Sequence, residues 1–275
     1  MNGQKYLQDI SRSLSTFLES GSADDLVSCL VGGSNLPGTR ANLELADAFA
    51  KTVREYAVHD ADDRRILWNL CVEFASIAPE DAPAGDPHEF LSFCGIRGIG
   101  AIGSISPAFA DLALGELHEA SVDPRWRERE AVTMGLADMI TAVRDKTLTE
   151  LEAWVESGAW LPMRAAAAGV AEPELLKDPA VTEAALKLHR KILIRVYTAA
   201  DPCSEEFAVL RKGLGYTLSV VVSARPEEGF EYLRQLAELD NTDIRWIVKE
   251  NLKESRLAKQ FPEKTAAIRD ILLQV

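Results

Sequence analysis

Arginine and tryptophan residues recur together in the second half of the sequence, and both residue types are suited to recognition. Trp126 precedes Arg127 and Arg129, and Arg245 stands beside Trp246. A guanidinium can bind a carboxylate or phosphate through two parallel hydrogen bonds, and an indole ring offers a flat apolar surface. We therefore expect a binding surface here. The candidate binding residues are Trp126, Arg127, Arg129, Trp160, Arg164, Arg211, Arg245, Trp246 and Lys249.

A structural role is the alternative for the same residues. Arginines at helix starts commonly pair with an acid in the next turn or repeat, and Asp123, Glu130 and Asp243 are close in sequence. The tryptophans could instead fill the packing between repeats. The structural role is favoured for the arginines, whereas neither role is favoured for Trp126 and Trp246.

Two groups of basic residues recur at helical spacing in the C-terminal half. The first is the stripe Arg245, Lys249, Lys253 and Arg256, and the second lies within residues 187–195. A solvated helix face with i,i+4 ion pairs is the ordinary explanation of such a stripe. The edge of a groove that binds an acidic peptide or a phosphate backbone is the other explanation.

No constellation of catalytic residues is visible in the sequence. It lacks GxSxG, HExxH, Walker A and zinc-ligand spacings, and its four cysteines and four histidines are scattered. We expect the cysteines to be buried, and we expect no metal site and no cofactor. The run 98–103 formally matches GxGxxG, but no βαβ alternation surrounds it. We expect these glycines to let a neighbouring helix approach closely.

The elements that must position these residues are helices. Apolar residues recur at three- and four-residue spacing, as in Leu7, Ile10, Leu14 and Phe17. Prolines in the first turn of a helix indicate further helix starts. We expect these at Ser106-Pro107, Asp123-Pro124, Asp178-Pro179 and Pro262-Glu263. The pattern predicts about a dozen to fourteen helices and no strand. The β-like run 218–222 continues a helical stretch, so we expect a buried helix there.

Several of these helices repeat. Taking Arg129 in the run 123–136 as an anchor, similar helix starts lie at Arg97, Arg164, Arg211 and Arg245, at intervals of 32, 35, 47 and 34 residues. An arginine followed by small or apolar residues resembles the start of the second helix in HEAT-type repeats. The resemblance implies an all-α superhelical stack of antiparallel helix pairs, an α-solenoid. We expect one HEAT-like domain over residues 1–275, with less regular helices in 1–85 and clearer repeats in 86–275. We also expect Met134 and Leu136 to face a core between repeats.

Charge bears on the kind of partner. The net charge is −13; residues 1–122 hold 8 basic and 18 acidic residues, a net of −10, and residues 123–275 hold 22 and 25, a net of −3. General nucleic-acid binding is therefore disfavoured. The preferred function is a non-enzymatic scaffold that holds a protein or peptide partner on the concave face of the stack.

A DNA-binding protein is the alternative function. The chain is more distantly similar in architecture to HEAT-like-repeat alkylpurine DNA glycosylases, which hold duplex DNA with Trp, Arg and an acid. Trp126, Asp138, Trp160 and Arg164 supply those residue types, without a motif that assigns a catalytic role to any of them. We expect no signal peptide and no membrane span, because no continuous apolar run is long enough, and hence a cytoplasmic protein. The sequence leaves the oligomeric state open.

Overall fold

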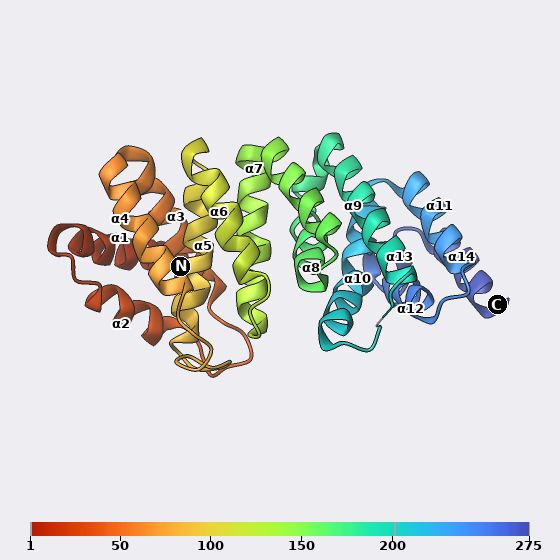
Figure 1. The fold of residues 1–275 in the computed structure, drawn as a ribbon, viewed down its shortest axis with the longest axis horizontal. Helices are drawn as coiled ribbons and strands as arrows, with labels where there is room; N and C mark the ends of the chain where they lie inside the picture. The colour runs from red at the N-terminus through yellow and green to blue at the C-terminus, as the bar shows by residue number, and fades with distance from the viewer. Residues whose placement is uncertain (1, 201, 275) are drawn as a thin grey trace. The chain divides into compact units, whose positions relative to one another are not determined.

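The protein is built from α-helices alone in the part of the chain that the structure describes. The computed structural model describes residues 2–200 and 202–274, and these form fourteen α-helices and one 3-10 turn (Figure 1). The prediction of an all-α chain with about a dozen to fourteen helices is confirmed. The chain divides into two compact units, residues 1–143 and 144–275. This division does not coincide with the change in repeat regularity that the sequence indicates at residues 85/86. The prediction that the whole chain is one domain stays a prediction.

The first unit stacks helices in chain order. Helix α3 packs against α1, α5 packs against α3, and both α4 and α6 pack on α5. The helices of this unit are α1 (Asn2–Ser20), α2 (Asp24–Gly33), α3 (Leu43–His59), α4 (Ala61–Ala75), α5 (Glu89–Gly103), α6 (Pro107–Ala120) and the first part of α7 (Trp126–Ser157).

Helix α5 is surrounded by other helices, and every one of its residues is buried. Its glycines make this possible. A Cβ at Gly100 would come 2.5 Å from the Cα of Gly135 on α7, and a Cβ at Gly98 would overlap the Sγ of Cys71 on α4. The GxGxxG run is therefore a close-packing surface for neighbouring helices, as the sequence predicted, and not a nucleotide-binding loop.

Helix α7 is interrupted where the two units divide. Val143 has φ −128° and ψ 48°, which is outside the helical region. Residues 126–142 belong to the first unit, and residues 144–157 belong to the second. The sequence pattern contained no proline or glycine at this point, so it did not predict the break.

The second unit also stacks antiparallel helices. Helix α10 lies between α8 and α12, α9 packs on α8 and α10, and α11 packs on α10, α12 and α14. Its elements after residue 157 are α8 (Trp160–Gly169), the 3-10 turn Leu175–Lys177, α9 (Pro179–Tyr197), α10 (Glu205–Ala224), α11 (Pro226–Ala237), α12 (Thr242–Asn251), α13 (Ser255–Ala258) and α14 (Pro262–Gln274).

Three of the four predicted helix starts are confirmed. Helices α6, α9 and α14 begin at Pro107, Pro179 and Pro262, and the Asp178 carboxylate accepts a hydrogen bond from the Ala180 backbone N–H. The prediction at Asp123-Pro124 is wrong, because α7 begins at Trp126. Asp123 instead accepts hydrogen bonds from the backbone and guanidinium of Arg125.

Helix α10 contains the β-like run 218–222, so the prediction of a buried helix there is confirmed. With 20 residues it is also long and apolar enough to cross a membrane by length and composition. Arg211 and Lys212 interrupt its apolar residues, so it contains no long continuous apolar run in the sequence. Because 56% of its most apolar window is buried and it packs between α8 and α12, it has the surroundings of a core helix.

The predictions of buried residues were partly right. Leu136 is fully buried, but Met134 is only half-buried. Cys71 and Cys94 are buried, whereas Cys203 is exposed and Cys29 is half-buried. The expectation that all four cysteines are buried is therefore wrong for two of them.

Candidate binding surface

Two of the three candidates at the start of α7 are buried and hold the first unit together. Arg127 donates from Nη1 to Glu89 Oε2 (3.1 Å) and from Nη2 to the Gly38 carbonyl (3.2 Å). Arg129 donates from Nη1 to the carbonyl oxygens of Asp123 and Pro124. The structural role that the sequence also allowed therefore describes Arg127 and Arg129.

Arg125, which sequence reasoning passed over, is the most extensively bonded arginine of this group. It is only 3% exposed. Its guanidinium donates to the carbonyl oxygens of Ile77 (2.9 Å) and Ala82 (3.1 Å) and to Asp123. It thereby fixes the loop between α4 and α5 to the start of α7. Three arginines alternate here with other residues, and their spacing alone does not say which of them points inward.

Glu128 lies in the same buried cluster without a hydrogen-bond donor. Neither carboxylate oxygen has a hydrogen-bond partner in the described part of the chain, and the nearest cation is Arg125, whose Nε is 3.9 Å from Oε2. Burial raises the pKa of Glu128 to about 8, and the neighbouring Glu89 and Asp123 act in the same direction. The Arg125 guanidinium opposes this rise in the pKa of Glu128, but burial outweighs it.

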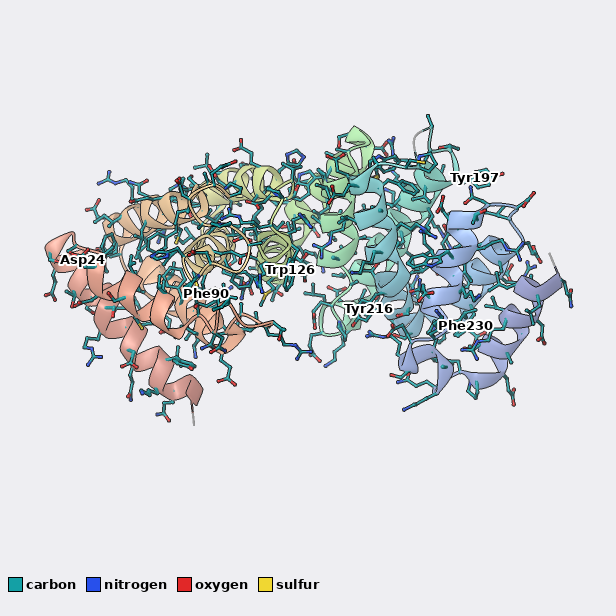
Figure 2. All side chains as sticks on the ribbon, turned by 90° about the horizontal axis from the view of Figure 1, so that it is seen from below. Asp24, Phe90, Trp126, Tyr197, Tyr216 and Phe230 are labelled. Carbon is teal, nitrogen blue, oxygen red and sulfur yellow. The ribbon has the colours of Figure 1, made fainter. Side chains whose placement is uncertain are left out.

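Trp126, which Figure 2 labels, is the candidate of the first unit that stays exposed, with a relative exposure of 48%. The Arg127 guanidinium carbon lies 4.5 Å from its ring centroid, so a cation–π contact holds the indole at the surface.

Arg97 does not begin a helix as expected; it lies in the middle of α5. It donates to Asp138 (2.8 Å) and Asp47 (3.0 Å), so the Asp138 carboxylate is neutralised by an arginine.

The candidates of the second unit lie on the row α8, α10 and α12. Two glycines of α10 make room for them. The position of a Cβ on Gly213 is 3.3 Å from Arg164 Cγ of α8, and that on Gly215 is 3.2 Å from the Trp246 ring of α12. Trp160 meets the Phe207 ring edge-on, with ring centroids 5.2 Å apart. Sequence-distant candidates are therefore brought against one helix.

Trp246 is contacted in this row by two residues of α10. The Arg211 guanidinium carbon lies 4.1 Å from its ring centroid, and Arg211 Nε is 2.9 Å from Asp243 Oδ1. The predicted pairing of a repeat arginine with Asp243 is thus found at Arg211. Arg211 itself lies inside α10 and not at its start, so the predicted helix start at Arg211 is wrong.

A groove of about 550 Å³ lies between α12 and α14. Three of the candidate residues, Arg245, Trp246 and Lys249, line it. The complete lining is Thr242, Arg245, Trp246, Lys249, Leu252, Lys253, Arg269, Leu272 and Leu273. Arg269, Leu272 and Leu273 were not predicted, because a sequence pattern does not show which later helix will face α12.

Two arginines cross this groove in opposite directions. Arg245 of α12 donates from Nη2 to the Leu272 carbonyl of α14 (2.6 Å), and Arg269 of α14 donates from Nη2 to the Leu252 carbonyl at the end of α12 (2.6 Å). Cations at helix C-termini offset the negative end of the helix dipole. The pair therefore fixes α14 against α12 and leaves further N–H groups on each guanidinium.

The other two cations of the groove are lysines. Lys249 is exposed, and no acid pairs with it among the residues that the structure describes. Lys253 pairs with Glu250.

The prediction of one continuous helical stripe is wrong, because α12 ends at Asn251 and Arg256 belongs to α13. Arg256 instead covers the exposed ring of Tyr216, which Figure 2 labels on the second unit.

The second basic group, within residues 187–195, is an acid-paired helix face. Lys187 and Lys191 both pair with Glu152, Lys191 and Arg195 pair with Glu156, and Arg190 pairs with Glu228. His189 is buried; its Nδ1 donates to the Ala185 carbonyl and its Nε2 accepts from the Thr217 hydroxyl. Desolvation lowers the pKa of His189 to about 4. The solvated-face interpretation therefore describes this group.

No cluster of three or more His, Cys, Asp or Glu side chains that could hold a metal ion occurs within the described residues. The candidate surface consists of cationic and apolar side chains on helices, which are groups that can bind a ligand through ion pairs and apolar contacts.

The stacked antiparallel helix pairs place the protein in the class of all-α solenoid repeat proteins. No family model matches the sequence. No curated protein matches it at a significant level. Solved structures with some similarity include a designed armadillo repeat protein, at 15% identity and a TM-score of 0.32, covering 82% of this chain and 98% of that one. Another designed armadillo repeat protein, in complex with a (KR)4 peptide, has 14% identity and a TM-score of 0.28, covering 82% of this chain and 98% of that one. Likeness at this level defines neither a relative nor a ligand.

Proposed function

We propose that this chain is a non-enzymatic binding protein of the HEAT-like type that holds a protein or peptide partner on the α8–α10–α12 row of its second unit. The groove between α12 and α14 anchors the partner. The observation that carries this proposal is the groove itself, about 550 Å³ in volume, with leucines and Trp246 between four cations.

The composition of the groove fits a recognition site. Tryptophan, tyrosine and arginine side chains contribute most of the binding energy at protein interfaces, particularly in well-packed pockets, and the groove has Trp246, Arg245 and Arg269. Trp246 is already immobilised by Arg211 and by the surface of Gly215, so binding costs little side-chain entropy there. A preorganised side chain on a helix is a better anchor than one on a loop.

A nucleic-acid enzyme has less support from the geometry. Arg127 and Arg129 are buried, and the Asp138 carboxylate is paired with Arg97, which disfavours it as a general base. We therefore keep DNA binding as an outcome of the tests.

The proposed function is tested by selecting a random peptide display library on the immobilised protein. The same library is selected on the double variant Lys249→Glu/Leu273→Ser, whose two positions are exposed and so leave the fold intact. We expect peptides that are enriched on the wild type and lost on this variant. A Trp126→Ala variant, altered in the first unit, is the matched control and should keep them. Absence of any enriched peptide, or equal enrichment on the double variant, contradicts the proposal.

A further inference from the structure

We infer that the partner segment of the α12–α14 groove is acidic and carries apolar side chains among its acids. This inference rests on the proposed function and deepens it, because it states the chemistry of the ligand. The groove would take a short peptide whose carboxylates meet the lysines and arginines and whose apolar side chains lie on Trp246 and the leucines.

The charge of the groove is opposite to that of the protein as a whole. Four of its nine lining residues are cationic and none is acidic: Arg245, Lys249, Lys253 and Arg269. Of these, Lys253 is paired with Glu250, which stands beside the groove. The chain nevertheless has a net charge of −13. A local positive site on an acidic protein attracts an acidic segment, while other surfaces repel it, so that charge sets where and in which orientation the segment binds.

The helix end beside the groove is made compatible with a carboxylate. The last carbonyl groups of a helix carry partial negative charge and would repel an anion. Arg269 donates to the Leu252 carbonyl at the end of α12, and Arg245 donates to the Leu272 carbonyl near the end of α14. Both carbonyl oxygens are thereby covered, and Lys249 remains exposed without an acid partner among the described side chains.

The apolar part of the groove indicates a peptide in preference to nucleic acid. Leu273 is 85% exposed, and Leu252 is buried beneath the groove. Phosphate backbones are bound by rows of cations, and exposed bases stack on aromatic rings; aliphatic side chains serve neither. An exposed leucine beside cations is suited to a ligand with both carboxylates and apolar side chains, as in an amphipathic helix that binds a groove.

The ligand chemistry is tested with three fluorescein-labelled peptides of about a dozen residues, measured by fluorescence anisotropy. The first combines Asp and Glu with Leu and Phe. The second replaces its acids with lysine, and the third replaces its apolar residues with serine. We expect the first to bind, with an affinity that falls as salt is raised, and the other two to bind at least about tenfold more weakly.

Variants then locate the binding. Lys249→Glu and Leu273→Ser should each lower affinity for the first peptide, the charge reversal by about tenfold or more. Lys259→Glu is the matched control, an exposed lysine of the second unit that does not line the groove, and it should leave affinity unchanged. Equal loss with Lys259→Glu would overturn the inference, because the effect would then report net charge alone.

The remaining outcomes separate the inference from the proposed function. If the display selection yields groove-dependent peptides but these are basic or lack apolar residues, the inference fails and the proposed function stands. If no peptide binds in either experiment, both fail. If duplex DNA binds at low salt, competes with the first peptide and is lost with Lys249→Glu, the groove is a nucleic-acid site and the inference is overturned.

Discussion

Glu128 provides a direct test of the buried charge cluster at the start of α7. Its pKa is raised to about 8, chiefly by burial; Arg125 opposes this rise, and Glu89 and Asp123 add to it. An unfolded chain has a glutamate pKa near the ordinary value of 4.5. Between these two values the folded protein holds a proton on Glu128 that the unfolded chain has released. The free energy of unfolding that this group contributes is therefore fully present below about pH 4.5 and is lost as the pH rises toward 8.

The size of the effect follows from proton linkage. One proton bound more tightly in the folded state changes the free energy of unfolding by about 1.4 kcal/mol per pH unit. Over the window from 4.5 to about 8 this amounts to at most about 5 kcal/mol. Glutamine has almost the same shape and is neutral at every pH. Glu128→Gln should therefore remove the slope and stabilise the protein by a few kcal/mol near pH 9.

The measurement is urea unfolding at several pH values between about 5 and 9, with a wild-type and a Glu128→Gln curve at each. Glu19→Gln is the matched control, since Glu19 is an exposed acid of the same unit. It should leave the pH dependence unchanged. If Glu128→Gln has the wild-type slope, or is less stable than wild type at pH 9, the carboxyl is not held protonated in the folded cluster.

Three other predictions concern the core. Burial lowers the pKa of His189 to about 4, so between about pH 6.5 and 4 the unfolded chain binds a proton that the folded unit does not. The free energy of unfolding should therefore fall as the pH falls from 6.5 toward 4. Urea unfolding of His189→Gln should show a flatter dependence of this free energy on pH. Leu136→Asp should cost several kcal/mol and Met134→Asp clearly less, since only Leu136 is fully buried; equal melting temperatures would show that their exposure is misassigned. Gly100→Ala should lower the melting temperature, because the new Cβ would meet Gly135 at 2.5 Å. Gly115→Ala on α6, where the new Cβ would point into open space, should raise the melting temperature slightly. The reverse order of melting temperatures would contradict the packing of α5.

The helices were predictable because their signals are local. Apolar spacing of three and four residues, together with proline after a capping residue, located the starts of α6, α9 and α14. The break at Val143 was not predictable from such signals, because its residue type is compatible with a helix. Whether a helix is interrupted at such a residue depends on packing between elements that are distant in the sequence.

The candidate site was predictable in its residue types but not in its composition. Trp246 and Lys249 were identified from their proximity to Arg245, and all three line the groove. Leu272 and Leu273 look like the apolar side of an ordinary helix, and only the packing of α14 on α12 makes them part of a site. Conversely, Arg127 is an arginine like Arg245, but its side chain is buried and hydrogen-bonded to Glu89 and to the Gly38 carbonyl. Residue type alone therefore does not separate a structural arginine from a groove arginine.

The two arginines that cross between α12 and α14 have a consequence for alanine scanning. Removing either guanidinium frees one helix-terminal carbonyl and loosens one helix from the other, because Arg245 holds Leu272 and Arg269 holds Leu252. Any ligand of the groove would then bind more weakly, whether or not it touches the substituted side chain. Arg245 and Arg269 will therefore score as binding hot spots for every ligand, and only the neighbouring Lys249 and Leu273 can distinguish one ligand chemistry from another.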